Sequence, residues 1–321
     1  MAKRAKKRAS RRPNRRRERR LVVVLLALLV MLASLIYMIH YEDTRRTVLR
    51  HNAEYSALYT PPTLAPAATN SPDPTTSPSP TPEPAATAEI AVDETREPLA
   101  TPDADTLIVA METPPPVQES FDALLAANAE TVGFLSIEDI LTLPVVQRPN
   151  DNEFYLDHAF DLEEDLGGTL FLDGSNLLVP EDDCLIVYGH NMRNGTMFQQ
   201  LINYEDPSFV SDNALVRFDT LYENRVYAPF AALTVTADPD SERYLNLRQF
   251  SFDRSSFERF MKSLRAMSAW DSPVEAEYGD RILLLVTCEY THDNGRFVLA
   301  LRARRDDESP EQLRAQAQQA K

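Results

Sequence analysis

Three polar residues near the ends of apolar runs have the side-chain types that acyl transfer requires. His190 follows the apolar run 184–187, Cys288 follows the run 282–286, and Arg296 directly precedes the run 297–301. A thiolate is a nucleophile, an imidazole can give a proton to a leaving amine, and a guanidinium can stabilise the oxyanion of a tetrahedral intermediate. These three residue types therefore point to cysteine-based acyl transfer.

The connection between Cys288 and Arg296 is short enough to place them side by side. Residues 289–295 form a seven-residue loop between the last two apolar runs, which suits adjacent antiparallel strands. Loops at strand ends are where a rigid scaffold usually carries catalytic groups. From the residues alone the assignment stays open, because a Cys at a strand end is often a small core residue and a lone His often makes only local hydrogen bonds.

The elements that would position these residues are short strands. Eight segments are strand-length, rich in β-branched and aromatic residues and bounded by turn residues. They read VGFLSI, LPVVQ, GGTLFLDG, CLIVYGH, ALVRFDT, RVYAPFAALTVT, RILLLVTCEY and RFVLALRAR. Many short strands with few helices favour a mainly β fold, a closed β-barrel with a few peripheral helices.

Helices are expected at three places in this part of the chain. Residues 120–129 and 255–267 carry apolar residues at helical spacing, and residues 196–203 form a shorter candidate. In the second of these, the apolar stripe consists of Phe257, Phe260, Met261 and Leu264. Residues 306–321 are polar and charged, and we expect them to be frayed.

The N-terminal residues are basic and directly precede an apolar run. Residues 1–20 hold 12 of the 33 Lys and Arg and one acid, Glu18, whereas the rest of the chain has a net charge of −27. Residues 21–38 contain no charge, and with Ile39 they approach the roughly 20 residues that cross a bilayer. This pattern predicts a membrane anchor with a cytoplasmic N-terminus and an extracellular body. A cleaved signal peptide is the alternative, although its apolar core is usually only about 7–15 residues long.

The remaining composition divides the chain into segments. Fourteen of the 23 prolines lie in residues 61–116, which predicts a disordered linker that keeps the folded domain away from the bilayer. We therefore expect a basic cytoplasmic tail (1–20), a transmembrane helix (21–40), a juxtamembrane segment with a short helix and the linker (41–117), the folded domain (118–305) and a charged tail (306–321). The acidic body would repel phosphate, so no nucleic-acid partner is expected.

The cysteines and histidines allow other interpretations. Cys184 lies six residues before His190, about 20 Å along a strand, so it is too far away to pair with that imidazole and reads as a buried hydrophobe. A structural disulfide between Cys184 and Cys288 is the alternative for both thiols. His158 and His292 could join His190 as metal ligands, but their spacing fits no ligand pattern. We expect neither a metal nor another cofactor.

A series of motifs runs in order through residues 118–305. The motifs are VGFLSI (132–137), LPVVQ (143–147), DNEFYL (151–156), GTLFLD (168–173), VYGHNM (187–192), GTMF (195–198) and LLLVTC (283–288), followed by Arg296. Together they resemble those of the sortases, and most closely the class B branch.

The resemblance implies an eight-stranded sortase β-barrel anchored outside a Gram-positive bacterium. Such an enzyme cuts the C-terminal sorting signal of a secreted protein after Thr, holds the fragment as a thioester, and passes it to an amine of a peptidoglycan cross-bridge or a pilin Lys. It implies that Cys288 is the nucleophile, His190 the general acid/base, and Arg296 the oxyanion and substrate clamp. It also implies the residues of the sorting-signal groove, which are Asn152, Leu156, Tyr188, Tyr244, Leu245, Thr287 and Glu289.

The chain departs from the family pattern beside the proposed nucleophile. The family commonly has TLxTC, whereas Leu284 replaces the first Thr here and Val286 stands where class B enzymes often have Ser. The segment 237–252, which corresponds to a substrate loop in the family, aligns only loosely. A hydrolytic cysteine peptidase, or a binding module with structural cysteines, are the other hypotheses.

Overall fold

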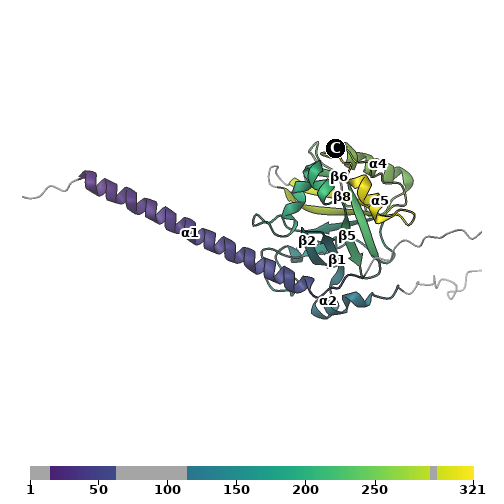
Figure 1. The fold of residues 1–321 in the computed structure, drawn as a ribbon, viewed down its shortest axis with the longest axis horizontal. Helices are drawn as coiled ribbons and strands as arrows, with labels where there is room; N and C mark the ends of the chain where they lie inside the picture. The colour runs from purple at the N-terminus through teal and green to yellow at the C-terminus, as the bar shows by residue number, and fades with distance from the viewer. Residues whose placement is uncertain (1–14, 63–113, 290–294) are drawn as a thin grey trace, which may run out of the picture.

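The computed structural model describes residues 15–62, 114–289 and 295–321, and for residues 15–19, 288 and 289 it describes the backbone only. The described residues form a closed eight-stranded barrel (Figure 1) in the order β1-β2-β3-β4-β7-β8-β6-β5. The neighbours β2 and β3 are parallel, as are β4 and β7, and the other neighbouring pairs are antiparallel. The strands are β1 Thr131–Ile137, β2 Leu141–Val146, β3 Leu170–Leu172, β4 Cys184–Tyr188, β5 Val216–Thr220, β6 Asn224–Thr236, β7 Ile282–Glu289 and β8 Gly295–Ala303. This architecture confirms the predicted mainly β barrel.

Alternate residues of β4 and β7 pack on opposite faces of the sheet, as the pleat of a strand requires. One set joins the core shared by all strands of the barrel and includes Leu185, Val187, Leu283 and Leu285. The other set joins a second cluster, which contains residues of the helix α4 (Arg254–Ala266), and includes Cys184, Ile186, Ile282, Leu284 and Val286. Both strands are therefore buried on both faces over most of their length.

The peripheral helices follow the sequence patterns in part. The predicted stripe of α4 is buried, and Asp253 caps the helix by accepting a hydrogen bond from the Ser256 backbone N–H. The expected helix 120–129 appears as η2 (Glu119–Phe121) followed by α2 (Asp122–Ala127). The helix expected at residues 196–203 is the 3₁₀ helix η4 (Phe198–Glu205). Two short helices, η3 (Phe154–Leu156) and α3 (Pro207–Asp212), were not anticipated.

The expectation of a frayed C-terminal tail is wrong. Residues Pro310–Ala317 form the helix α5, which begins with a capping box between Ser309 and Gln312. Leu313 and Ala317 are fully buried in the cluster that contains α4. A segment that is polar overall therefore folds because two apolar positions, one turn apart, meet an apolar surface.

The N-terminal helix α1 (Arg15–Ser56) is continuous and reaches the barrel. It is the one helix in the described part of the chain that is long and apolar enough to cross a membrane, and its window of highest hydropathy averages 3.0. Figure 1 shows it projecting far beyond the barrel, with its C-terminal end against β1 and β2. Val48 is buried in the barrel core, and the Ser56 hydroxyl donates to the Thr142 carbonyl. The expected juxtamembrane helix is thus the last part of α1.

The chain on either side of the proline-rich linker binds the same region of the barrel. Tyr59 stacks on Phe134 at 4.2 Å between ring centroids, and its hydroxyl donates to Asp219 of β5 at 2.8 Å. Gln118 donates from its side chain to the Thr220 carbonyl at 2.8 Å. Residues 63–113 of the predicted linker lie outside the described residues, and its role as a spacer stays a prediction. The last part of α1 packs directly on the barrel, so the helix that contains the apolar stretch also contacts the folded domain.

Candidate active site

The register of β7 and β8 brings the predicted nucleophile and cation together. Cys288 pairs directly with Arg296, and Glu289 pairs with Gly295. The strands are antiparallel neighbours, so the sequence prediction that Cys288 and Arg296 lie side by side is confirmed. For Cys288 and Glu289 the structure describes the backbone only. The predicted role of the Glu289 side chain in the groove therefore stays a prediction.

The backbone that carries His190 is fixed to the same end of β7. The parallel pairing of β4 with β7 continues past Tyr188, since the Gly189 N–H donates to the Val286 carbonyl at 3.2 Å. The Thr287 hydroxyl donates to the Gly189 carbonyl at 2.7 Å and is buried. Because Gly189 is bonded to Val286 and Thr287, the backbone of the next residue, His190, lies near the end of β7 that carries Cys288.

Glycine is required at position 189 because of close packing. A Cβ there would lie 2.4 Å from Leu170 and 2.8 Å from the ring of Phe198. A side chain there would force Leu170, Phe198 or the backbone that leads into His190 to shift. The motif Tyr188-Gly189-His190 therefore has a packing requirement beside its polar residue.

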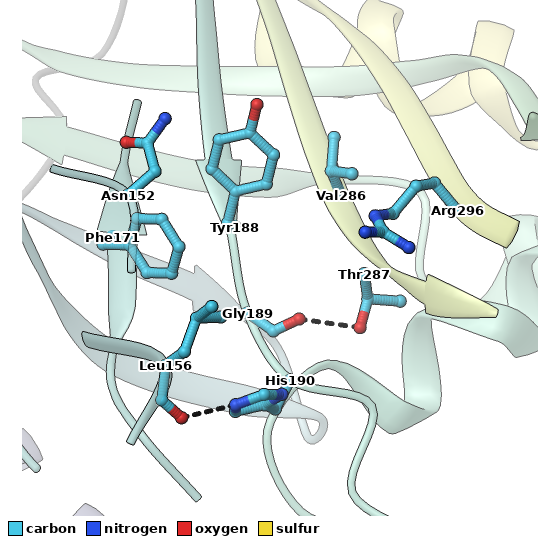
Figure 2. Close-up of a pocket in the computed structure, with 9 residues that line it drawn as sticks. All are labelled: Asn152, Leu156, Phe171, Tyr188, Gly189, His190, Val286, Thr287 and Arg296. Atoms are coloured by element: carbon cyan, nitrogen blue, oxygen red, sulfur yellow. Dashed lines mark hydrogen bonds between the residues drawn. The ribbon is translucent and has the colours of Figure 1, made fainter. Parts of the chain in front are cut away.

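The His190 ring is oriented by the backbone of η3. Its Nε2 atom forms a short hydrogen bond with the Leu156 carbonyl (Figure 2). A carbonyl oxygen only accepts, so Nε2 carries the hydrogen and Nδ1 is the nitrogen left to exchange a proton. The half-buried imidazole is thereby presented to the cavity in a fixed tautomer.

His190 and Arg296 line one cavity of about 340 Å³ (Figure 2). Of the residues predicted for the sorting-signal groove, this cavity contains Asn152, Leu156, Tyr188 and Thr287. The sequence interpretation missed three further lining residues, Phe171, Gly189 and Val286. The alternation along β4 and β7 could have indicated Val286, because it follows Ile282 and Leu284 on one face.

A second cavity of about 190 Å³ adjoins the first and shares Tyr188, Val286 and Arg296 with it. Its other wall comes from residues 237–253, the segment between β6 and α4, and contains Tyr244 and Leu245. The structure thus distributes the predicted groove residues over two adjoining cavities, with Tyr188 and Arg296 common to both.

Two polar groups of the site are held by close neighbours. The Tyr188 ring stacks on Phe171, and its hydroxyl donates to Asp173 at 3.1 Å. Burial, and then the negative charge of Asp173, raise the pKa of Tyr188, so this side chain stays a neutral phenol. The Arg296 guanidinium donates to the Gly295 carbonyl at 2.9 Å and lies half-buried at the cavity wall.

The alternatives for the other thiol and the histidines can be compared with the geometry. Cys184 is 0 % exposed and free, so the Cys184–Cys288 disulfide is wrong. Burial raises the pKa of the Cys184 thiol. His158 bonds locally to Phe154 and Asp157, each at 2.8 Å, whereas His292 lies outside the described residues. Among the described residues, no group of three or more His, Cys, Asp or Glu side chains could hold a metal ion.

Known proteins share this barrel and its sequence. The Sortase B of Listeria monocytogenes is 31% identical over 186 residues, which cover 57% of this chain and 73% of that protein. The chain belongs to the sortase B family. The Sortase B of Staphylococcus aureus is 28% identical over 186 residues, covering 57% of this chain and 74% of that protein. No family model matches the chain.

The solved structures agree with this assignment. A Staphylococcus aureus sortase B–substrate complex superimposes with a TM-score of 0.54 and 28% identity, covering 59% of this chain and 86% of that one. The resemblance to class B sortases is therefore confirmed, and the protein is a cysteine transpeptidase with the sortase barrel. The hypothesis of a binding module with structural cysteines is wrong.

Proposed function

We propose that this sortase cuts the C-terminal sorting signal of a secreted protein after Thr and transfers the new acyl end to an amine. The amine belongs to a peptidoglycan cross-bridge or to a pilin Lys. One observation carries the proposal: the pairing of Cys288 with Arg296, next to the backbone that holds His190, at the edge of an open cavity. A nucleophile, a proton donor and a cation then meet where a peptide has room to bind.

In the first step, the Cys288 thiolate attacks the carbonyl carbon of the scissile amide. The carbonyl electrons move to oxygen, and the Arg296 guanidinium stabilises the resulting oxyanion, together with the backbone N–H of Glu289. The C–N bond then breaks as protonated His190 gives a proton to the leaving amine. The product is a thioester on Cys288 and a released C-terminal fragment.

The hydrogen bond between His190 and Leu156 determines which nitrogen carries this proton. Because Nε2 donates to the Leu156 carbonyl in both the neutral and the charged ring, Nδ1 gives and recovers the proton. In the second step, Nδ1 accepts a proton from the incoming amine as that amine attacks the thioester carbonyl. The amide forms, the C–S bond breaks, and Cys288 leaves as thiolate.

The two adjoining cavities suit an extended peptide. Leu156 is 37% exposed at the first, and Tyr244 is 40% exposed at the second. Such exposed apolar surface beside polar backbone is what a bound peptide would cover. The sorting signal therefore runs past Tyr188 and Arg296, which border both cavities.

The helix α1 is the proposed membrane anchor. Its apolar residues are exposed, and the basic residues 1–20 precede them, so the N-terminus stays in the cytoplasm and the barrel lies outside. A secreted substrate would meet the barrel on that side of the membrane.

Product analysis tests the proposal and separates it from hydrolysis. The full chain is incubated in detergent with a panel of sorting-signal peptides, with and without triglycine or a lysine peptide. We expect cleavage after Thr and an amide product that requires the added amine. A released acid in equal yield with and without amine would identify a hydrolytic cysteine peptidase and contradict the proposed transfer.

A further inference from the structure

A buried carboxylate binds two residues that line the cavities: Tyr188, which lines both, and Arg248, which lines the second. Asp173, directly after β3, is 0 % exposed. Its carboxylate accepts hydrogen bonds from Arg248 Nε at 2.9 Å, Arg248 Nη2 at 3.0 Å, the Tyr188 hydroxyl at 3.1 Å and the Ser175 backbone N–H at 2.9 Å. A buried charge is tolerated only when it is paired in this way.

The arginine of this pair belongs to the segment that forms the outer wall. Residues 237–253 connect β6 to α4 mostly without regular secondary structure, and they carry Tyr244 and Leu245. The Arg248 guanidinium crosses from this segment to the β3–β4 side of the barrel, where it also donates to the Ser175 hydroxyl at 2.8 Å. Its hydrogen bonds with Asp173 raise the pKa of Arg248. This two-pronged ion pair is therefore one attachment of the wall to the barrel beside the cavity. The Phe250 carbonyl, which accepts from the Cys184 N–H at 3.0 Å, is another, farther along the segment.

The Asp173 carboxylate also binds Tyr188, which borders both cavities. Tyr188 lines both of them, and its hydroxyl has Asp173 as acceptor. A movement of Asp173 would break its hydrogen bond with Tyr188 and its ion pair with Arg248 of the wall at the same time. None of these contacts involves His190, which is held separately by Leu156.

We propose that Asp173 and Arg248 are positioning residues that set the width of the sorting-signal groove between Tyr188 and the wall carrying Tyr244 and Leu245. The pair controls how tightly and how selectively the signal binds, and it leaves the chemistry at Cys288 unchanged. This inference rests on the proposed function, because the occupant of the groove is the sorting signal.

Arg248→Met is the most direct test, because it removes the ion pair while keeping much of the apolar stem. We expect KM for a signal peptide to rise about tenfold, with kcat changed less than about twofold, since the lost contact positions bound peptide without touching the reacting atoms. Arg248→Lys keeps the charge without the two-pronged geometry and should recover part of the KM. Arg243→Met is the matched control, since Arg243 is an exposed arginine of the same segment, and it should leave KM unchanged.

A double variant separates positioning from general stability. Arg248→Met leaves the Asp173 carboxylate buried without its partner, which lowers the Tm. Adding Asp173→Asn removes that charge and should recover much of the Tm, while KM stays high because the wall still lacks its ion pair beside the cavity. A KM that returns to the wild-type value together with the Tm would overturn the proposal, and so would an unchanged KM in Arg248→Met.

Amide hydrogen exchange measures the mobility of the wall without depending on turnover. In Arg248→Met, the amides of residues 237–247 should exchange faster, while those of β7 stay protected; equal exchange in the variant and the wild type would contradict the attachment. If the wild type processes no signal peptide, the proposed function fails, and the exchange comparison still decides whether Arg248 holds the wall.

Discussion

The two ends of the β4–β7 pair have opposite environments although they belong to the same two strands. At one end, Cys184 pairs with Ile282, and both are buried in the cluster that contains α4. At the other end, Tyr188 pairs with Val286, and both line the cavities, although Val286 is itself buried and packs in the same cluster. The difference teaches that burial removes Cys184 from chemistry, whereas the backbone of Cys288 lies just beyond the end of the pair that borders the cavities.

Burial has a direct chemical consequence at the closed end. A thiol without water or a cation nearby stays protonated, and only the thiolate is a nucleophile. At the open end, the backbone register pairs Cys288 with Arg296.

The largest effect is expected from removing the thiol at the open end. Cys288→Ala should lower signal cleavage by at least about 10³-fold, because no other group in the cavity can form the thioester. Cys184→Ala is the matched control and should keep the activity within about threefold, with a stability loss of about 1 kcal/mol from the small cavity. Peptide cleavage and thermal unfolding measure both. Comparable activity losses in the two variants would remove the distinction between the ends.

The next effect concerns the proton carrier at the open end. His190→Gln has a side-chain amide that can still donate to the Leu156 carbonyl, but it has no titratable nitrogen. We expect kcat to fall about 10²- to 10⁴-fold. A variant that keeps the wild-type kcat would show that His190 is not the general acid/base.

Removal of α1 should weaken the open end more than the closed end. The Tyr41 hydroxyl donates to the Arg193 carbonyl at 3.0 Å, and Asn52 contacts the Met197 sulfur at 3.7 Å, so α1 supports the loop that follows His190. A chain beginning at Gln118 also loses Tyr59 from its stack on Phe134, which should cost about 3–5 kcal/mol.

A chain that begins at Tyr41 is the control for this deletion, because it keeps the docked part of α1. Hydrogen exchange should increase around residues 190–197 in the shorter chain and stay low at β4. Equal thermal stability of the two chains would contradict the importance of the docked helix.

A smaller effect is expected from the bond that joins β7 to the His190 backbone. Thr287→Val keeps the shape but removes the hydroxyl that donates to the Gly189 carbonyl. The buried Gly189 carbonyl then loses its hydrogen-bond donor, which should cost about 1 kcal/mol in stability and up to about tenfold in kcat. Thr287→Ser restores the hydroxyl and should recover most of the kcat. A wild-type kcat in Thr287→Val would show that this bond does not position His190.

The smallest change is expected in the labelling of Cys184, at the closed end, when the pH is raised. Burial raises the pKa of Cys184, so raising the pH from 7 to 9 leaves this thiol protonated and unlabelled by iodoacetamide in the folded chain. In denaturant its pKa returns to about 8.5, and labelling should follow pH. Rapid labelling of Cys184 in the native protein at pH 9 would contradict the closed environment.

Much of the site was predictable because its signals are local. The strand ends at His190 and Cys288 are marked by apolar runs, and the short loop before Arg296 predicts their neighbouring strands. The stripe of α4 is likewise visible in its spacing. Family motifs then supplied the roles of these residues and most of the groove.

The remaining features depend on contacts between distant residues. Asp173 reads as an ordinary turn residue until folding brings Arg248 to it, and nothing in the spacing of the two indicates a pair. The sequence of the docked end of α1 looks polar, and its contact with the barrel core depends largely on one apolar residue, Val48. One residue is too few to form an apolar pattern. The helix α5 depends in the same way on Leu313 and Ala317, too few residues to produce a visible pattern.

Mass spectrometry of peptides from the trapped enzyme tests the central contrast most directly. The wild-type chain is mixed with a sorting-signal peptide without an amine, quenched in acid and digested. We predict an acyl adduct on Cys288, absent from Cys288→Ala and present at wild-type level in Cys184→Ala. An adduct on Cys184, or no adduct on Cys288 with any peptide that is cleaved, would contradict the account.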